Sequence, residues 1–296
     1  MNHAGLRLGL AAALALSFAS PGASAPRLLG DTTLSIPQNA AFGGLSAIVM
    51  DPDGAGAVVM SDRATMFEIS FARGAGQGRV TAVTLMRSSP LADAEGRLPL
   101  RPDRMDAEGL ARLPDGRLAL SFEGDMRIAI HGRDGRERLR IAPPPGSDAL
   151  PRNGAYEGLA ADSLGRLYTL AEHAPGRGPT PLFRHASGVW ERYGNIPRFG
   201  TFRPVGLDFD DRGRLYVLER RFSLGGFASR ITRYPAGEHG PGPGEVVLLT
   251  PTGRHGNLEG LGLWRRSDGT LVASAVSDNG FRRPDATRLV EYVIPD

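Results

Sequence analysis

Hydrophobic and polar residues form short runs along the chain in which every second residue is apolar, and glycine, proline and aspartate separate these runs. A period of two is typical of half-buried β-strands, and the separating residues are typical of tight turns. Beyond residue 25, no segment keeps the period of an amphipathic helix. The pattern therefore predicts an all-β protein.

Five stretches of the chain share one plan. Each begins with x-Gly-Leu or a close variant, continues as a short strand, turns at a glycine, and ends a second strand near an acidic residue. The five stretches are residues 43–63, 108–124, 157–173, 205–221 and 259–279. Their first glycines recur about every 50 to 65 residues, a length that suits the four-stranded blades of a β-propeller; they are Gly44, Gly109, Gly158, Gly206 and Gly260.

The segments between these hairpins supply the outer strands of each blade. Residues 65–72 and 78–86 follow the first hairpin, and both alternate or run apolar. We expect residues 287–294 to be the third strand of the last blade and residues 28–36 its fourth, which closes the ring and removes exposed sheet edges. The prediction is a propeller of five blades, with a degenerate sixth blade within residues 64–105 as the alternative.

The first 25 residues are predicted to be a signal peptide. Arg7 precedes an apolar stretch, residues 8–19, and Ala23-Ser24-Ala25 matches an A-x-A cleavage site. The apolar stretch is too short to span a bilayer as a stable helix, and no other segment approaches a membrane span. We therefore expect residues 26–296 to form one exported domain, periplasmic or secreted, that is monomeric and not inserted into a membrane.

Charge and cysteine content narrow the possible partners and ligands. The chain has 35 basic residues, all of them arginine, against 32 acidic residues, and the two kinds are interspersed. This distribution does not resemble the basic patch of a nucleic-acid-binding protein, so we expect no nucleic-acid partner. The absence of cysteine excludes disulfides and thiolate metal sites.

The acidic residues of the five hairpins are predicted to converge on one face. In an antiparallel hairpin, the start of the first strand and the end of the second lie at the same edge. If these are the inner strands of each blade, this edge faces one mouth of the central channel. The acids concerned are Glu108, Glu157 and Glu259 at the strand starts, and Asp62, Glu123, Glu172, Glu219 and Asp278 at the strand ends.

So many like charges repel one another unless a cation lies among them. Calcium suits this rim because it binds six to eight oxygen ligands, whereas zinc does not, because only one histidine, His173, falls there. The alternative is that these acids only join neighbouring blades through hydrogen bonds to the backbone. Cationic residues at the same rim suit a small anionic ligand; these are Arg63, His173, Arg203, Arg220 and Arg221.

The stretches "FGGLSAI", "DAEGLARLPDG", "YEGLAADSLGRLYTLAEH" and "GNLEGLGL", followed by "SDNGF", resemble the phytase-like domain family. Members are described as esterase-like proteins related to phytase, and the resemblance covers about residues 40–294 in the same order. It implies an exported bacterial β-propeller with kinship to alkaline phytases, which hold calcium with carboxylates and cut phosphomonoesters by metal-activated water. Arginine would here take the part of the phosphate-holding lysines, which this chain lacks.

The resemblance implies a division of roles among the rim residues. Calcium would be held by Asp62, Glu108, Glu123, Glu157, Glu259 and Asp278. Arg63, His173, Arg220 and Arg221 would bind the substrate, and Glu172 or Glu219 would accept the proton of the attacking water. We thus expect a calcium-dependent phosphoester hydrolase. A lactonase or carboxylesterase propeller and a non-catalytic ligand-binding propeller remain the alternatives.

Overall fold

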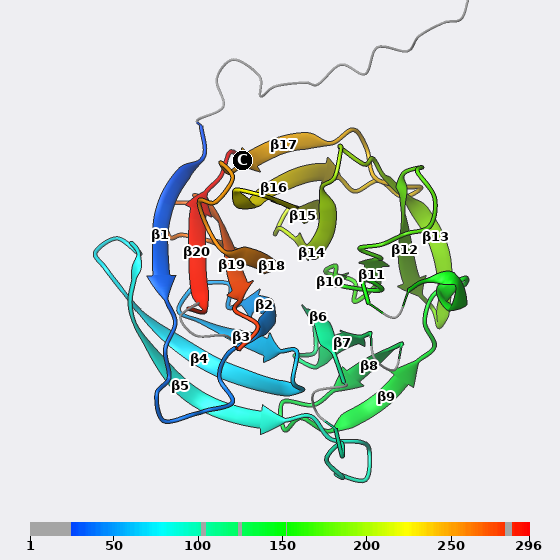
Figure 1. Cartoon of the computed structure of the whole chain (residues 1–296), viewed down its shortest axis with the longest axis horizontal. Coiled ribbons are helices and arrows are strands. Elements are labelled where there is room, and N and C mark those ends of the chain that lie inside the picture. Colours follow the sequence, from blue (N-terminus) through cyan, green and yellow to red (C-terminus); the bar gives the residue numbers. More distant parts are fainter. Residues whose placement is uncertain (1–24, 102–104, 124–125, 152, 282–285) are drawn as a thin grey trace, which may run out of the picture.

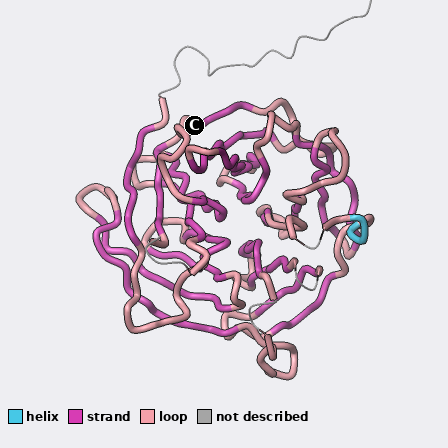
Figure 2. Tube along the Cα trace, in the orientation of Figure 1, coloured by secondary structure: helices cyan, strands magenta, loops and turns pink. Residues whose placement is uncertain are grey.

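Five four-stranded antiparallel sheets surround a central axis in the computed structural model (Figure 1). The structure describes residues 25–101, 105–123, 126–151, 153–281 and 286–296. Figure 2 shows that strands and loops make up nearly all of this part, with one short helical turn, η2 (Ser147–Ala149). The predicted five-bladed propeller is confirmed, and no sixth blade occurs among the described residues.

Each blade is built from strands that follow one another outward from the axis (Figure 1). Blade 1 contains β2 (Leu45–Met50), β3 (Gly56–Ser61), β4 (Thr65–Arg73) and β5 (Val80–Pro90). Blade 2 contains β6 (Ala107–Arg112), β7 (Leu118–Phe122), β8 (Arg127–His131) and β9 (Glu137–Ile141). Blade 3 contains β10 (Gly158–Ala161), β11 (Leu167–Leu170), β12 (Thr180–Ala186) and β13 (Val189–Ile196).

Blade 4 contains β14 (Arg203–Phe209), β15 (Arg214–Ser223), β16 (Gly226–Pro235) and β17 (Glu245–Leu249). Blade 5 combines both ends of the chain: β18 (Asn257–Arg265), β19 (Leu271–Asp278), β20 (Arg288–Val293) and, as its outer strand, β1 (Arg27–Thr33). The pairing of β1 with β20 confirms the predicted closure of the ring. It covers the outer edge of β20, which would otherwise expose its backbone hydrogen-bonding groups.

The hydrophobic core lies between neighbouring blades rather than within one. Strands β3 and β7 are buried along their whole length, as expected of strands covered on both faces, whereas the outer strand β5 is mostly exposed. One apolar cluster joins blades 1 and 5 through Phe67, Trp264 and Val276. A buried ion pair between Arg73 and Glu291, with nitrogen–oxygen distances of 2.9 and 2.8 Å, ties the same two blades together.

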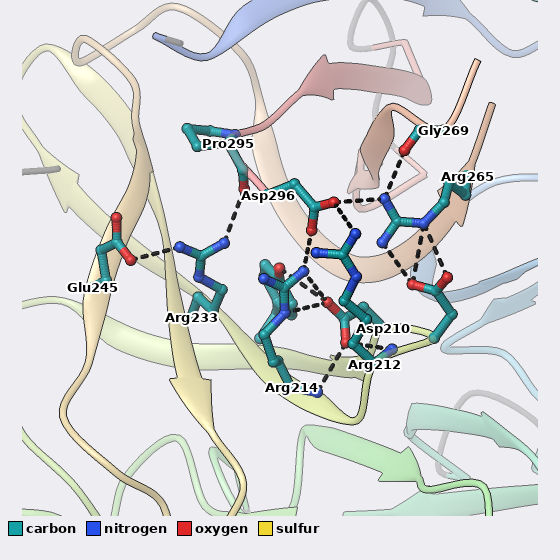
Figure 3. A network of polar contacts seen from close by, with 11 residues as sticks. Asp210, Arg212, Arg214, Arg233, Glu245, Arg265, Gly269, Pro295 and Asp296 are labelled. Atoms are coloured by element: carbon teal, nitrogen blue, oxygen red, sulfur yellow. Dashed lines mark hydrogen bonds and ion pairs between the residues drawn. The ribbon is translucent and has the colours of Figure 1, made fainter. Parts of the chain in front are cut away.

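The C-terminus fastens blade 5 to blade 4 at one end of the channel (Figure 3). The Asp296 carboxylate accepts hydrogen bonds from Arg214 of β15 and Arg265 of β18, and it also pairs with Arg212 at 2.9 Å. The carbonyl of Pro295 accepts a bond of 3.1 Å from Arg233. Because Arg214 begins β15 and Arg220 lies near its end, this fastening is at the opposite end from Arg220.

Glycines on the innermost strands let neighbouring blades approach closely. A Cβ atom on Gly260 would lie 2.7 Å from Cα of Ala47, and one on Gly206 would lie 2.7 Å from the carbonyl oxygen of Glu259. In blade 1, Ala47 therefore takes the place of the repeated glycine. The sequence alignment that put Gly44 there is corrected: Gly44 has a φ of 52° and packs against Phe281.

Two expectations concern the N-terminal region and membranes. Residues 1–24, which make up nearly all of the predicted signal peptide, lie outside the described residues. In the part of the chain that the structure describes, no helix has the length and apolar character needed to cross a membrane.

Candidate metal and substrate site at the channel mouth

Two positions in each blade lie at the same mouth of the channel. The first is the residue just before the close-packed glycine or Ala47; in four blades it is the extra residue of a β-bulge. A bulge leaves this residue out of the strand pairing and re-aims its side chain. These inner positions hold Ser46, Glu108, Glu157, Val205 and Glu259.

The second position lies at or just beyond the end of the second strand. Asp278 faces Asn257 in blade 5, and Arg220 faces Arg203 in blade 4. The register of all five hairpins makes the equivalent residues Asp62, Glu123, Glu172, Arg220 and Asp278. An arginine therefore stands in blade 4 where each of the other blades has an acid.

Arg220 is a half-buried cation in a ring of carboxylates. It donates hydrogen bonds to Glu259 and, at 3.3 Å, to Glu172, and its distance to Glu157 is 3.8 Å. Burial disfavours its charge, but attraction to Glu259, Glu157 and Glu172 outweighs burial and raises its pKa. Arg220 thus links blades 3, 4 and 5 at the mouth.

A carboxylate cluster lies on the side of the ring formed by blade 2. One oxygen from each of Asp106, Glu108 and Glu123 lies within 4.8 Å of the others. Asp106, which the sequence analysis missed, precedes β6 and has a φ of 49°, a conformation tolerated best by glycine, asparagine and aspartate. Glu123 is 3% exposed, and its Oε1 has no hydrogen-bond partner among the described residues.

The carboxylic acids that lie at this mouth are called the mouth acids below. They are Asp62, Asp106, Glu108, Glu123, Glu157, Glu172, Glu259 and Asp278. Seven of them were predicted from the sequence. Arg220 and Arg63 act electrostatically on several of them.

Burial and mutual repulsion raise the pKa values of several mouth acids. Burial raises the pKa of Glu259 to about 8 and that of Glu123 to about 7, although Arg220 and backbone amides respectively oppose these shifts. Burial, with Glu259 and Glu157 adding repulsion, holds the pKa of Glu108 well above its usual range. Burial and the nearby Asp278 raise the pKa of Asp62 to about 6. The structure thus concentrates negative charge at a cost that a bound cation would relieve.

The side chains of Glu219 and Arg221 do not point toward the mouth acids, contrary to the expectation from the sequence. Successive side chains of a strand point to opposite faces, so Glu219 and Arg221 of β15 face away from Arg220. Glu219 is 1% exposed and accepts two hydrogen bonds from Arg230, at 2.8 and 2.7 Å. Arg221 stacks on Phe202, with 4.9 Å between its guanidinium carbon and the ring centre.

His173 and Arg63 lie at the outer edge of the mouth, as expected. Nδ1 of His173 is 3.1 Å from Oε2 of Glu172, and its side chain is 45% exposed. The guanidinium of the exposed Arg63 lies over the ring of Phe281, 3.6 Å from its centre. Arg63 thus remains accessible to solvent, whereas Arg220 is enclosed by its acidic partners.

A small cavity lies behind the mouth. Ser46, Glu108, Glu157 and Val205 line a cavity of about 10 Å³ on the axis, room for about one water molecule. A ligand larger than an ion would not fit in this cavity.

The fold and this geometry define the chain as a five-bladed β-propeller with an acid-rich channel mouth and one enclosed arginine. A family model described as "Phytase-like: Esterase-like activity of phytase" matches residues 40–281. The chain belongs to this phytase-like family, which confirms the resemblance seen in the sequence. No curated protein gives a significant match.

Solved structures share the propeller fold at low sequence identity. The gluconolactonase XC5397 from Xanthomonas campestris is 15% identical, with a TM-score of 0.50 over 93% of this chain and 96% of that one. The PQQ-bound aldose sugar dehydrogenase from Streptomyces coelicolor is 14% identical, with a TM-score of 0.47 over 93% and 100%. Virginiamycin B lyase from Staphylococcus aureus is 14% identical, with a TM-score of 0.44 over 89% and 73%.

Proposed function

We propose that this protein is an exported, calcium-dependent ester hydrolase whose site is the ring of mouth acids, with phosphomonoesters as the first candidate substrates. The observation that carries the proposal is the cluster of Asp106, Glu108 and Glu123, in which a buried carboxylate oxygen of Glu123 lacks a hydrogen-bond partner among the described residues. Unpaired buried carboxylate oxygens are costly unless an ion takes them up.

The donor set fits calcium. Carboxylate oxygens are the ligands that hard divalent cations prefer, and calcium accepts six to eight of them with flexible geometry. Asp106, Glu108 and Glu123 would hold the ion, and Glu157 and Glu259 lie close enough to Glu108 to raise its pKa. When bound, calcium supplies positive charge that polarises an ester oxygen and makes a water molecule more acidic.

The chain's own residues would bind and deprotonate the reactants. Arg63, exposed at the mouth, would pair with the phosphoryl group of an incoming substrate. Glu172 and His173, which are in contact at 3.1 Å, would accept the proton as the oxygen of water attacks phosphorus. The same pair would return this proton to the departing alcohol oxygen as its bond to phosphorus breaks. Arg220 would hold Glu172 and Glu259 in position.

Hydrolysis of a lactone or carboxylic ester is the second candidate. The observation favouring it is the cluster of Asp106, Glu108 and Glu123, whose negative charge repels an anionic substrate more than a neutral one whenever no cation is bound. A panel of p-nitrophenyl phosphate, phytate, an acetate ester and a lactone, assayed with calcium and with a chelator, separates the two candidates.

Calorimetric titration with calcium tests the metal site directly. We expect Glu108→Gln and Glu123→Gln to weaken calcium binding by at least about tenfold, because each removes a charged ligand. The matched control is Glu95→Gln. Glu95 is an exposed acid near the start of the loop between β5 and β6, away from the cluster in sequence, so this variant should bind calcium as the wild type does. Wild-type affinity in both cluster variants would rule out this calcium site.

The two cluster variants also have an expected effect on stability. Without calcium at pH 8, each glutamine removes one of several mutually repelling carboxylates, so both variants should unfold at a higher temperature than the wild type. A rise in apo stability together with a loss of calcium affinity identifies the cluster as a ligand site. A loss of both apo stability and calcium affinity would instead indicate that these acids only join the blades.

A further inference from the structure

A hairpin of blade 4 extends past the mouth acids. Strands β15 and β16 stay paired as far as Ser223 and Gly226, whereas the pairing of β14 with β15 ends at Arg220 and that of β16 with β17 ends at Arg230. The end of the hairpin therefore lies on the side of the mouth, where residues 250–253 run alongside it and the backbone N–H of Gly253 donates a hydrogen bond of 2.7 Å to the carbonyl oxygen of Phe227.

The tip of this hairpin is apolar and exposed. Phe222 is 70% exposed and Leu224 is fully exposed, and the ring of Phe222 lies 4.9 Å from that of Phe227. These two exposed apolar side chains contribute little to folding. Exposed apolar patches often mark binding sites.

The hairpin tip and the acidic mouth share one face. Phe222 lies two residues beyond Arg220 on β15, and Phe227 is its direct partner on β16, so all three side chains project from the same face. Phe227 also lines a cavity of about 500 Å³ whose other walls include Asn257, Asp278 and Arg288.

This cavity is continuous with the candidate site. Asn257 accepts a hydrogen bond from Arg220 and donates one of 2.8 Å to Glu259, so the same side chain forms a wall of the cavity and part of the ring. Arg288, on the other side, is already bonded to Asp31 at 2.7 Å. The cavity thus offers one aromatic ring, that of Phe227, in a mainly polar lining beside the mouth acids, and the arginine among its described lining residues is paired.

We infer that this cavity binds the apolar part of an ester substrate, an aromatic or alkyl group, while the ester group lies at the mouth acids. The inference rests on the proposed function and narrows its substrate class. A polyol carrying many phosphates would need several unpaired cations, whereas the one arginine among the described residues that line this cavity, Arg288, is paired with Asp31. An aryl ester would place its ester group at the mouth acids and its ring against Phe227.

Binding of non-hydrolysable phosphonates to the calcium-loaded full chain tests the inference without relying on turnover. We expect phenylphosphonate to bind about tenfold more tightly than methylphosphonate, because the phenyl group loses its contact with water against Phe227. Phe227→Ala and the surface variant Phe222→Ser should each reduce this ratio at least about threefold and leave methylphosphonate binding unchanged. Phe222→Ser removes the exposed ring that packs 4.9 Å from the ring of Phe227, so it loosens this wall of the cavity even where Phe227→Ala disturbs folding.

The matched control is Leu164→Ser. Leu164 is 74% exposed in the turn between β10 and β11, at the opposite end of the channel, and this variant should keep the wild-type ratio. Equal affinities for the two phosphonates in the wild type would overturn the inference alone. No binding of either phosphonate would overturn the phosphoester proposal and this inference with it. Equal affinities combined with binding of the wild type, but not Phe222→Ser, to phosphatidylcholine vesicles would assign the tip to a lipid surface instead.

Discussion

Arg220 decides the electrostatics of the mouth at the scale of single residues. It is the one position of its kind occupied by a cation, and it contacts Glu259, Glu172 and Glu157 from two other blades. A buried acid that loses its counterion is strongly destabilising. Glu157, Glu172 and Glu259 therefore depend on this guanidinium whenever no metal is bound.

Replacing Arg220 by leucine should lower the free energy of unfolding by about 3 kcal/mol in the presence of a chelator at pH 8. Calcium should recover part of this loss, because the ion supplies positive charge to the same ring. Denaturant unfolding with and without calcium measures both effects. Arg97→Leu, which breaks an exposed pair with Asp93, serves as the control and should leave stability unchanged. Equal losses in the two variants would contradict this role of Arg220.

At the scale of elements, the close packing of the innermost strands places the inner mouth positions. The bulge that leaves Glu259 unpaired is followed at once by Gly260, whose Cα faces the backbone of Ala47 and Ile48 in blade 1. The approach of the two backbones and the direction of the Glu259 side chain thus arise from the same irregularity in β18.

Gly260→Ala should therefore destabilise the ring by about 2 kcal/mol, because the added methyl group would lie 2.7 to 2.8 Å from three backbone atoms that cannot move independently. Thermal unfolding measures this loss. Gly178→Ala is the control: it lies in an exposed loop with no atom within 4 Å of the added Cβ, and its stability should change by less than about 0.5 kcal/mol. Similar stability of the two variants would show that the blades can separate to accept the methyl group.

At the scale of the whole molecule, the ring gathers acids from all parts of the chain into one small volume. Blades 1, 2, 3 and 5 each contribute carboxylates, and closure of the ring by β1 and β20 holds them there. The repulsion among these acids opposes folding, so the stability of the molecule should depend on pH and on calcium together.

The sign of this dependence follows from the raised pKa values. Glu259, with a pKa of about 8, and Glu123, with a pKa of about 7, bind more protons in the folded than in the unfolded chain from about pH 4.5 upward. In a chelator, the unfolding temperature should therefore fall as pH rises from 5 to 8.5. Saturating calcium should stabilise the protein most at the high end of this range, because protons and calcium compete for the same oxygens. Scanning calorimetry across pH measures both trends, and a calcium effect that is independent of pH would contradict them.

The repeats in the sequence predict part of the site, and their spacing also identifies Arg220 as a mouth residue. Arg220 follows Gly213 by seven residues, as Glu123 follows Gly116 and Glu172 follows Gly165. This spacing assigns Arg220, and not Glu219, to the mouth, whereas the expectation of an acid at each strand end favours Glu219. Asp106 had no such signal, since it lies before the repeated hairpin.

The sequence alone determined the strands, the five blades, the closure of the ring and the edge at which most mouth acids lie, because these depend on local period, turn residues and repeat length. Only the tertiary structure decided which side chains meet. Strand register and bulges set the direction of each side chain, so Glu219 pairs with Arg230 while its neighbour Arg220 enters the acidic ring. Register and bulges arise from pairing with other strands, which a single stretch of sequence does not contain.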